Sequence, residues 1–318
     1  MESQTRSVLL LGATGTAGRG AAIGLTEAGH RVTAVVRDGA DTNGLPSDVK
    51  VKTGTPLALA PEDAAGHDAL VLCLASRTGL PADAWAIDHA ATVRAIDAAQ
   101  AGGVAHVVLL SAICVQRPDL AFQQAKLAAE AHLRASGLTW SIVRPTAFFK
   151  SLSGQIARVQ SGKPYLLFGD GRLTACTPIS DNDLGRFIAA CLTDPDKQNR
   201  ILPIGGPGPA LTPLEMGEEL FRLTGQPPTY RRVPVAMMSA IIAALSLAGR
   251  VSSKAHDKAE FARIGRYYAT QSMLSLDETG TYSREATPSF GTETLFDHYR
   301  DVIEGRAKVA LGDHAAFS

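Results

Sequence analysis

Short apolar runs alternate with alanine-rich segments through the first half of the chain. The apolar runs are SVLLLG, RVTAVVR, ALVLCLA, HVVLLS and WSIVRP. The segments predicted to be helical include those at about 17–29, 84–101 and 120–136. Continuous apolar strands separated by amphipathic helices are typical of a parallel sheet that is covered on both faces. The pattern from Ser7 to Pro145 therefore predicts a doubly wound α/β domain.

The alternation of apolar strands and helices becomes less regular after Pro145. Glycine and proline cluster in GKPYLLFGDG and PIGGPGPALTP, which are typical of turns and loops. The remaining predicted elements are helices at about 212–224, 234–248, 255–267 and 292–304 and short strands at 166–168, 201–204 and 273–276. We expect residues 1–150 to form the first domain and residues 151–318 a smaller mixed lobe intertwined with it. This lobe is expected over the carboxyl ends of the strands, where open α/β sheets bind ligands.

Composition narrows the possible functions. The chain has 318 residues, of which 45% are hydrophobic, so a sizeable core is expected. Lysine plus arginine equal aspartate plus glutamate at 31 each, and no global charge favours nucleic acid. The four cysteines, Cys73, Cys114, Cys176 and Cys191, lack metal-ligand spacing and are expected to be reduced thiols packed in the interior. No metal site is expected.

The first strand is predicted to begin at about Ser7, which leaves no room for a signal or transit peptide and favours a cytoplasmic protein. The most apolar stretch is Val233 to Val251, but its run from Val235 to Gly249 is shorter than the ~20 residues of a spanning helix. A helix packed inside the second lobe is one interpretation. A pocket lid or peripheral membrane contact through 235–249 is the other, because an apolar stripe includes Met237, Met238, Ile241, Ile242 and Leu245.

A glycine-rich loop, GATGTAG, follows the first strand directly and opens the first helix. Gly12 permits a tight turn, Gly15 lets the backbone approach a pyrophosphate, and Gly18 allows helix and strand to pack closely. The helix amino terminus supplies amide donors to the anion. Strand, loop and helix occur in the order of a Rossmann-type domain, which predicts a dinucleotide cofactor.

The second apolar strand ends in Arg37, where NAD-binding domains tend to carry an acidic residue for the ribose 2′-hydroxyl. With Arg19, it provides two guanidinium groups that are able to bind a 2′-phosphate. This favours NADP(H). The alternative is a solvated Arg37, with Asp38 binding the ribose hydroxyl.

Later strand ends complete the expected cofactor site. Lys126 is expected to hydrogen-bond the ribose hydroxyls, the alternative being an exposed helix lysine. Four residues before it stands Phe122, where short-chain dehydrogenases carry a tyrosine that protonates the substrate oxygen. The predicted cofactor-binding residues are Gly12, Thr14, Gly15, Thr16, Ala17, Gly18, Arg19, Arg37, Leu74, Ala75, Ser76, Ser111, Lys126, Pro145, Thr146 and Phe148.

The sequence resembles the divinyl chlorophyllide a 8-vinyl-reductases, which are NADPH-dependent atypical short-chain dehydrogenases of chlorophyll and bacteriochlorophyll synthesis. The resemblance runs from about Val8 to the C-terminal helix. It rests on the strings LASR, WAID, LLSAICVQRP, FQQAKL, SIVRPTAFFKSLSGQ, GKPYLLFGDG, LPIGGPGPALTPLE and IGRYYA. It implies reduction of the 8-vinyl group of a divinyl chlorophyllide, or of a related protochlorophyllide, to ethyl, and a location that is cytoplasmic or peripheral to photosynthetic membranes.

Phe122 is compatible with that reaction, because a C=C bond conjugated to a macrocycle needs no phenolic proton at a carbonyl oxygen. Lys126 and Ser111 are the candidate catalytic residues, and the proton donor is open among solvent, Lys126, Lys150 and two tyrosines, Tyr267 and Tyr268. The candidate substrate-binding residues are Phe148, Phe149, Lys150, Arg266 and Tyr267. For the charged pair the alternatives are a solvated Lys150 and an Arg266 paired with a carboxylate such as Glu260.

Two other functions fit the cofactor motifs. One is an NADP(H)-dependent reductase of another conjugated small molecule, such as a quinone. The other is a non-catalytic NADP(H)-sensing or assembly protein, because the tyrosine is also missing from relatives of the short-chain dehydrogenases that no longer catalyse a reaction.

Overall fold

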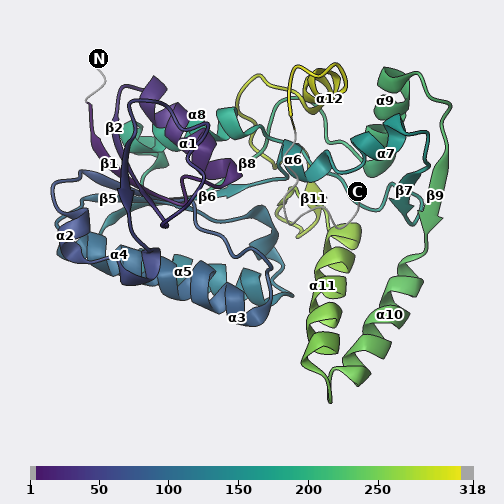
Figure 1. Cartoon of the computed structure of the whole chain (residues 1–318), viewed down its shortest axis with the longest axis horizontal. Helices are drawn as coiled ribbons and strands as arrows, with labels where there is room; N and C mark the ends of the chain where they lie inside the picture. Colours follow the sequence, from purple (N-terminus) through teal and green to yellow (C-terminus); the bar gives the residue numbers. More distant parts are fainter. Residues whose placement is uncertain (1–4, 309–318) are drawn as a thin grey trace. The chain divides into compact units, whose positions relative to one another are not determined.

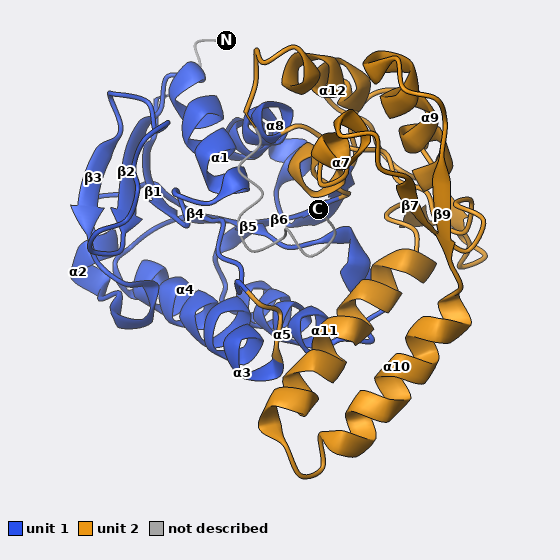
Figure 2. Ribbon diagram, turned by 45° about the vertical axis from the view of Figure 1, so that its right-hand side comes forward, with its two compact units in different colours: residues 1–77, 81–145, 181–204 blue, residues 78–80, 146–180, 205–318 orange. Residues whose placement is uncertain are grey.

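The computed structural model describes residues 5–308 and divides into two compact units. Figure 2 shows the first unit in blue and the second in orange. The first contains residues 1–77, 81–145 and 181–204, and the second contains residues 78–80, 146–180 and 205–318. The chain therefore leaves the first unit after β6 and returns to it for residues 181–204.

A seven-stranded sheet forms the centre of the first unit. Its strand order is β3-β2-β1-β4-β5-β6-β8, and every pairing is parallel. This confirms the predicted parallel α/β sheet. The strands are β1 (Ser7–Leu11), β2 (Arg31–Val36), β3 (Lys50–Thr53), β4 (Ala69–Leu72), β5 (His106–Leu110), β6 (Thr139–Pro145) and β8 (Arg200–Ile204).

Helices cover both faces of this sheet (Figure 1). On one face lie α1 (Thr16–Glu27) and α8 (Asp181–Thr193). The other face carries α2 (Pro61–Ala64), α3 (Pro81–Ala84), a π-helix η2 (Trp85–Ala91), α4 (Thr92–Ala101) and α5 (Ala121–Ala135). Short 3-10 turns are η1 (Pro56–Ala58), η3 (Ile113–Gln116) and η4 (Pro195–Lys197). Strands β1, β4 and β5 are buried almost throughout, which explains their continuous apolar runs.

Two strands differ from the sequence prediction. We expected residues 201–204 among the strands of the C-terminal lobe, but β8 pairs with β6 as the edge strand of the main sheet. The other edge strand, β3, was not among the apolar runs because its residues, KVKT, are all exposed. Both exceptions are edge strands, which bury less apolar surface than central ones.

The second unit contains two small sheets and several helices. Strands β7 (Tyr165–Phe168) and β9 (Tyr230–Val233) pair in parallel, and β10 (Ser275–Leu276) and β11 (Tyr282–Ser283) pair antiparallel. The helices are α6 (Phe149–Leu152), α7 (Ile156–Gln160), α9 (Pro213–Thr224), α10 (Val235–Ala248), α11 (Ser253–Thr270) and α12 (Leu295–Ile303). The four long helices confirm those predicted for the tail, each within a few residues.

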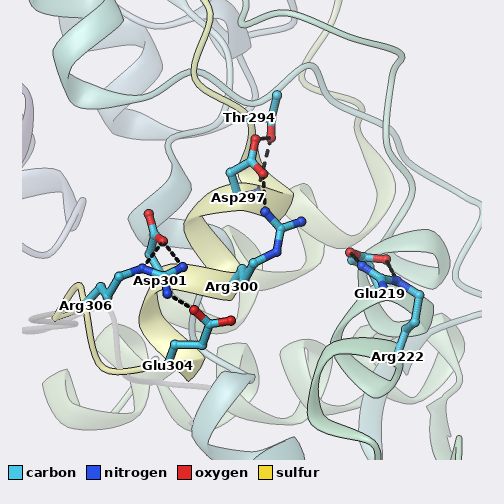
Figure 3. A network of polar contacts seen from close by, with 8 residues as sticks. All are labelled: Glu219, Arg222, Thr294, Asp297, Arg300, Asp301, Glu304 and Arg306. Carbon is cyan, nitrogen blue, oxygen red and sulfur yellow. Dashed lines mark hydrogen bonds and ion pairs between the residues drawn. The ribbon is translucent and has the colours of Figure 1, made fainter.

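Ion pairs line the polar side of α12 and the neighbouring α9 (Figure 3). Thr294 caps α12 by accepting a hydrogen bond from the Asp297 amide at 3.2 Å, and Arg300 pairs with the Asp297 carboxylate at 2.6 Å. Farther along, Arg306 contacts Asp301, and on α9 Arg222 pairs with Glu219. The charged groups of α12 are about half exposed, so each of their pairs contributes little to stability.

Helices α10 and α11 of the second unit form a hairpin (Figure 2), and the exposed side of α10 is apolar. Only Ile242 of α10 is buried, whereas Met237 and Ile241 are about half exposed and Leu247 is 65% exposed. Across residues 5–308, every helix is too short or too polar to span a bilayer.

Candidate cofactor site

The glycine-rich loop joins β1 to α1 at the carboxyl edge of the sheet. Gly12 has a φ of +83°, and a Cβ there would lie 2.4 Å from the carbonyl oxygen of Cys73 on the neighbouring strand end. At Gly18 a Cβ would lie 2.0 Å from the carbonyl oxygen of Gly12. Both positions therefore require glycine, for the turn and for close packing of helix against strand.

The loop presents an anion-binding end of a helix. Gly15 is the exposed N-cap of α1 and contributes no side-chain cap, and the first turn of α1 contains no acidic residue. The amides of this turn and the positive end of the helix dipole thus face solvent without a competing carboxylate. This geometry fits the pyrophosphate of a dinucleotide.

Arg19 lies against the loop that follows β2. Its Nη2 donates to the backbone oxygen of Asp41 at 3.2 Å and lies 3.4 Å from the Asp41 carboxylate. The Arg19 Nε is buried and has no hydrogen-bond partner among the described residues. Arg37 is exposed at the end of β2. An unpaired guanidinium donor and a solvated arginine at this edge fit a 2′-phosphate. Asp41 was not among the residues predicted from the sequence to lie at the cofactor site.

A narrow crevice, too tight to admit a water molecule, lies between the ends of β4 and β5 and the helices beneath them. Its lining consists of Leu74, Asp88, Thr92, Leu109, Leu110, Ser111, Lys126 and Ala129. Three predicted cofactor residues, Leu74, Ser111 and Lys126, thus come together. The Ser111 hydroxyl is buried and has no hydrogen-bond partner within residues 5–308. A buried hydroxyl without a partner is costly, so it fits a site completed by a polar ligand.

Lys126 is paired rather than solvated. Its Nζ lies 2.8 Å from Oδ1 of Asp88, and only 12% of the lysine side chain is exposed. The other carboxylate oxygen of Asp88 accepts a hydrogen bond from the Ser76 amide at 3.3 Å. The alternative of an exposed helix lysine is therefore wrong. Asp88 links two predicted cofactor residues and was not among the residues predicted from the sequence.

Phe122 lies one helical turn before Lys126 on α5 and is 9% exposed. No hydroxyl stands at this position of the helix. Of the segment Pro145 to Phe148, Pro145 ends β6 in the first unit, and Thr146 and Phe148 belong to the second unit. Thr146 hydrogen-bonds there to the backbone oxygen of Thr177.

The predicted substrate residues all lie in the second unit. Phe149 is buried and packs on the His298 ring at 5.4 Å, and Tyr267 is buried against Tyr268 at 5.7 Å. Lys150 on α6 is half-buried, and Arg266 is exposed. The alternative pairing of Arg266 with Glu260 is not found, because Glu260 pairs with Arg263 one turn earlier on α11.

All four cysteines are buried free thiols, as predicted. Burial raises the pKa of Cys73, which lies at the end of β4, to about 12, and the positive charge of Lys126 lowers it in part. Cys73 is therefore a neutral packing residue beneath the phosphate loop.

Comparison with known proteins identifies the family. Residues 12–195 match a family of NAD(P)H-binding domains. The divinyl chlorophyllide a 8-vinyl-reductase of Zea mays is 48% identical over 98% of this chain and 83% of its own length. The chain belongs to the divinyl chlorophyllide a 8-vinyl-reductase family. The Arabidopsis thaliana member of this vinyl-reductase family is 52% identical over 78% of this chain and 61% of its own length.

Solved structures show the same fold. The NADPH-dependent quinone oxidoreductase QOR2 of Escherichia coli, in complex with NADPH, superposes with a TM-score of 0.66 at 19% identity. The match covers 93% of this chain and 99% of that one. This similarity agrees with the parallel α/β fold that the sequence predicts.

Proposed function

We propose that this protein reduces the C8 vinyl group of 3,8-divinyl chlorophyllide a, or of divinyl protochlorophyllide, to an ethyl group with NADPH. The observation that carries the proposal is the 48% identity to a curated vinyl reductase over 98% of the chain. The intact phosphate loop and the unpaired polar atoms of Arg19 and Ser111 support the cofactor assignment.

The residues of the first unit have distinct roles in this proposal. Amides at the start of α1 bind the pyrophosphate, and Arg19 with Arg37 bind the 2′-phosphate. Ser111 and Lys126 bind the nicotinamide ribose and fix the position of the ring above the sheet edge. Reduction of the vinyl group consumes one hydride, which NADPH supplies when bound, and one proton. Much of the rate enhancement then comes from positioning.

Phe122 agrees with reduction of a C=C bond. A carbonyl reductase must protonate an oxygen as the hydride adds, and its tyrosine does so. When a hydride adds to the terminal carbon of the vinyl group, the negative charge spreads into the macrocycle. The other vinyl carbon, which is attached to the macrocycle, is protonated afterwards. The donor is solvent or one of the side chains Lys126, Lys150, Tyr267 and Tyr268.

The second unit supplies the pigment contacts in this proposal. The half-buried Phe148 is a candidate to stack on the macrocycle, and the cationic side chains of Lys150 and Arg266 are candidates to pair with its propionate. Phe149 and Tyr267 are buried, so their part in substrate binding is to support the groups around them.

The decisive experiment mixes the purified protein with divinyl chlorophyllide a and NADPH in detergent and follows the Soret band and chromatographic retention. We expect the monovinyl product, with NADH much less effective. A Lys126→Met variant should lose most of the activity, while Lys52→Met, on the edge strand β3, should not. Tight NADPH binding without pigment conversion would favour a different conjugated substrate or a sensing role.

We also propose that the α10 segment 235–249 contacts membranes peripherally. It carries no charged residue, its side chains are largely exposed, and Arg250, Lys254 and Lys258 follow it at the exposed end of the hairpin. Apolar groups beside basic ones favour the surface of an anionic bilayer. Flotation with phosphatidylglycerol vesicles should recover the protein, and Leu247→Glu should reduce recovery. Equal recovery of both proteins, or none of either, would contradict the proposal.

A further inference from the structure

The WAID motif has no role in the function proposed so far. Its four residues begin the π-helix η2, which joins α3 to α4 in one continuous helix. The hydroxyl of Thr92 bonds to the Ile87 backbone oxygen five residues earlier, at the end of this wide turn. π-helical turns are rare and occur often at functional sites.

The π-helix places Asp88 in the interior. Asp88 is 3% exposed, whereas Trp85, at the start of the same segment, is 42% exposed. A carboxylate buried to this degree is expensive unless a positive charge or hydrogen-bond donors compensate it. The groups that compensate the Asp88 carboxylate therefore indicate its role.

Both carboxylate oxygens of Asp88 contact predicted cofactor residues. Oδ1 lies 2.8 Å from Nζ of Lys126, although this oxygen has no partner in hydrogen-bonding geometry among the described residues. Oδ2 accepts from the Ser76 amide in the segment after β4. The thiol of Cys73 feels the same lysine charge, but burial raises its pKa to about 12 and leaves it neutral. Asp88 is thus the anion that lies against Lys126.

We propose that Asp88 is a positioning residue for the cofactor, which holds the Lys126 ammonium at the wall of the crevice beside Ser111. A lysine side chain has four rotatable bonds and loses much rotamer entropy when it is fixed. The ion pair fixes it before the cofactor arrives, so less of that entropy is lost on binding. The proposal rests on the proposed cofactor role of Lys126 and requires nothing of the pigment.

The test is a double-mutant cycle on NADPH binding, followed by the fluorescence of the reduced nicotinamide without pigment. Asp88→Asn keeps an acceptor for the Ser76 amide and removes the charge that holds Lys126. We expect the Kd for NADPH to rise about tenfold in the otherwise unchanged protein. In a Lys126→Met background the same substitution should change Kd by less than twofold, because there is no ammonium left to position.

A matched control is available on the neighbouring turns. Asp97 on α4 pairs with His132 on α5 at 2.7 Å, so it links the same continuous α3–η2–α4 helix to α5, but it is 55% exposed and lies outside the crevice. Asp97→Asn should leave the Kd for NADPH unchanged. A general loosening of the α4–α5 packing would affect both aspartate variants alike.

Three results would overturn the proposal. They are an unchanged Kd in Asp88→Asn, an equal loss in the two backgrounds, and an equal loss in the Asp97→Asn control. If Asp88→Asn alone does not fold, Lys126→Met is compared with the double variant, which carries neither charge. Equal Kd values support the proposal, and a further loss in the double variant contradicts it. Failure to reduce the pigment would leave these binding results unaffected, so the two proposals fail separately.

Discussion

At the scale of single residues, the spacing of FQQAK made Lys126 predictable as a cofactor residue, but it gave no indication of Asp88, with which Lys126 pairs. A separation of four places Phe122 and Lys126 on one face of α5. The missing phenol is evident from the sequence, and so is the ammonium one turn later. The partner of that ammonium, Asp88, lies 38 residues away in a π-helical turn. Periodicity at 3.6 residues does not indicate which side chain such a turn directs inward.

Restoring the tyrosine should have little effect on the proposed reaction. Phe122→Tyr adds a hydroxyl at a buried position, so we expect a small loss of stability, about 1 kcal/mol. The rate of vinyl reduction should stay within about threefold of the unchanged protein, because the proposed reaction has no substrate oxygen for the tyrosine hydroxyl to protonate. Initial rates at saturating NADPH, together with thermal unfolding, provide the check. A gain of tenfold or more would show that a phenolic proton limits the reaction.

Arg37 should discriminate between the two nicotinamide cofactors. Arg37→Ala removes a charge-assisted contact to the 2′-phosphate, so the KM for NADPH should rise roughly 10- to 100-fold, as expected for about 1.5–3 kcal/mol. The KM for NADH should change little. The exposed Arg31, at the other end of the same strand, provides the control Arg31→Ala. Equal losses with both cofactors would contradict a 2′-phosphate role.

At the scale of helices and strands, the buried elements were the predictable ones. Central strands such as β5 are apolar along their length, whereas the exposed β3 has no such pattern. Helix α8 was not predicted; it lies between the two segments rich in glycine and proline that were assigned to turns and loops. It packs on α1 through glycines, and a Cβ on Gly185 would lie 1.9 Å from the carbonyl oxygen of Gly20. Such a contact between distant segments leaves no local signal in the sequence.

The α1–α8 contact should therefore be sensitive to a single methyl group. Gly185→Ala would force the two helices apart, and α1 carries the phosphate loop at its amino end. We expect a loss on the order of 3 kcal/mol in unfolding free energy and weaker NADPH binding. The comparison is Gly154→Ala, where a Cβ would meet no atom within 4 Å. Urea denaturation of both variants distinguishes close packing from a general effect of losing glycine.

The cap of α12 provides a second test at this scale. Thr294→Ala removes the acceptor for the Asp297 amide (Figure 3). We expect a loss of about 1 kcal/mol, typical of threonine caps, with no change in NADPH binding. Thr294→Ser keeps the hydroxyl and should retain most of the stability. Similar losses in both variants would show that the threonine methyl group, rather than the cap, is what stabilises the helix.

At the scale of the whole molecule, the chain passes through the first unit, enters the second, returns for α8 and β8, and leaves again. A sequence reading that follows the chain in order assigns β8 to the wrong unit, because the pairing partner of a strand is set by tertiary contacts. The glycine-rich loop was predictable because all of its glycines lie within GATGTAG. The crevice was predictable only in part, because it forms where α5, η2 and two strand ends, which are distant in the sequence, come together.

Histidines in the interior should make the stability of the whole protein depend on pH. His106 on β5 is 1% exposed and shares a hydrogen bond with the Ser141 hydroxyl at 3.0 Å. Burial, together with the smaller effect of the positive charge of Arg6, lowers the pKa of His106 to about 4. Burial and Arg6 also lower the pKa of His30. The His106 imidazole is therefore neutral in the folded protein at mildly acidic pH.

The sign of the effect follows from proton uptake. Below pH 6.5 the unfolded chain protonates His106, while the folded protein does so only near pH 4. The unfolding free energy must therefore fall as the pH decreases between these values, by about 1.4 kcal/mol per pH unit for one such histidine. Urea denaturation at pH 7.5 and pH 5.0 should differ by about 2 kcal/mol from His106 alone. His106→Gln should flatten this dependence, and the exposed His256→Gln should not. An unchanged slope in His106→Gln would show that His106 is already protonated in the folded protein, or that other groups dominate.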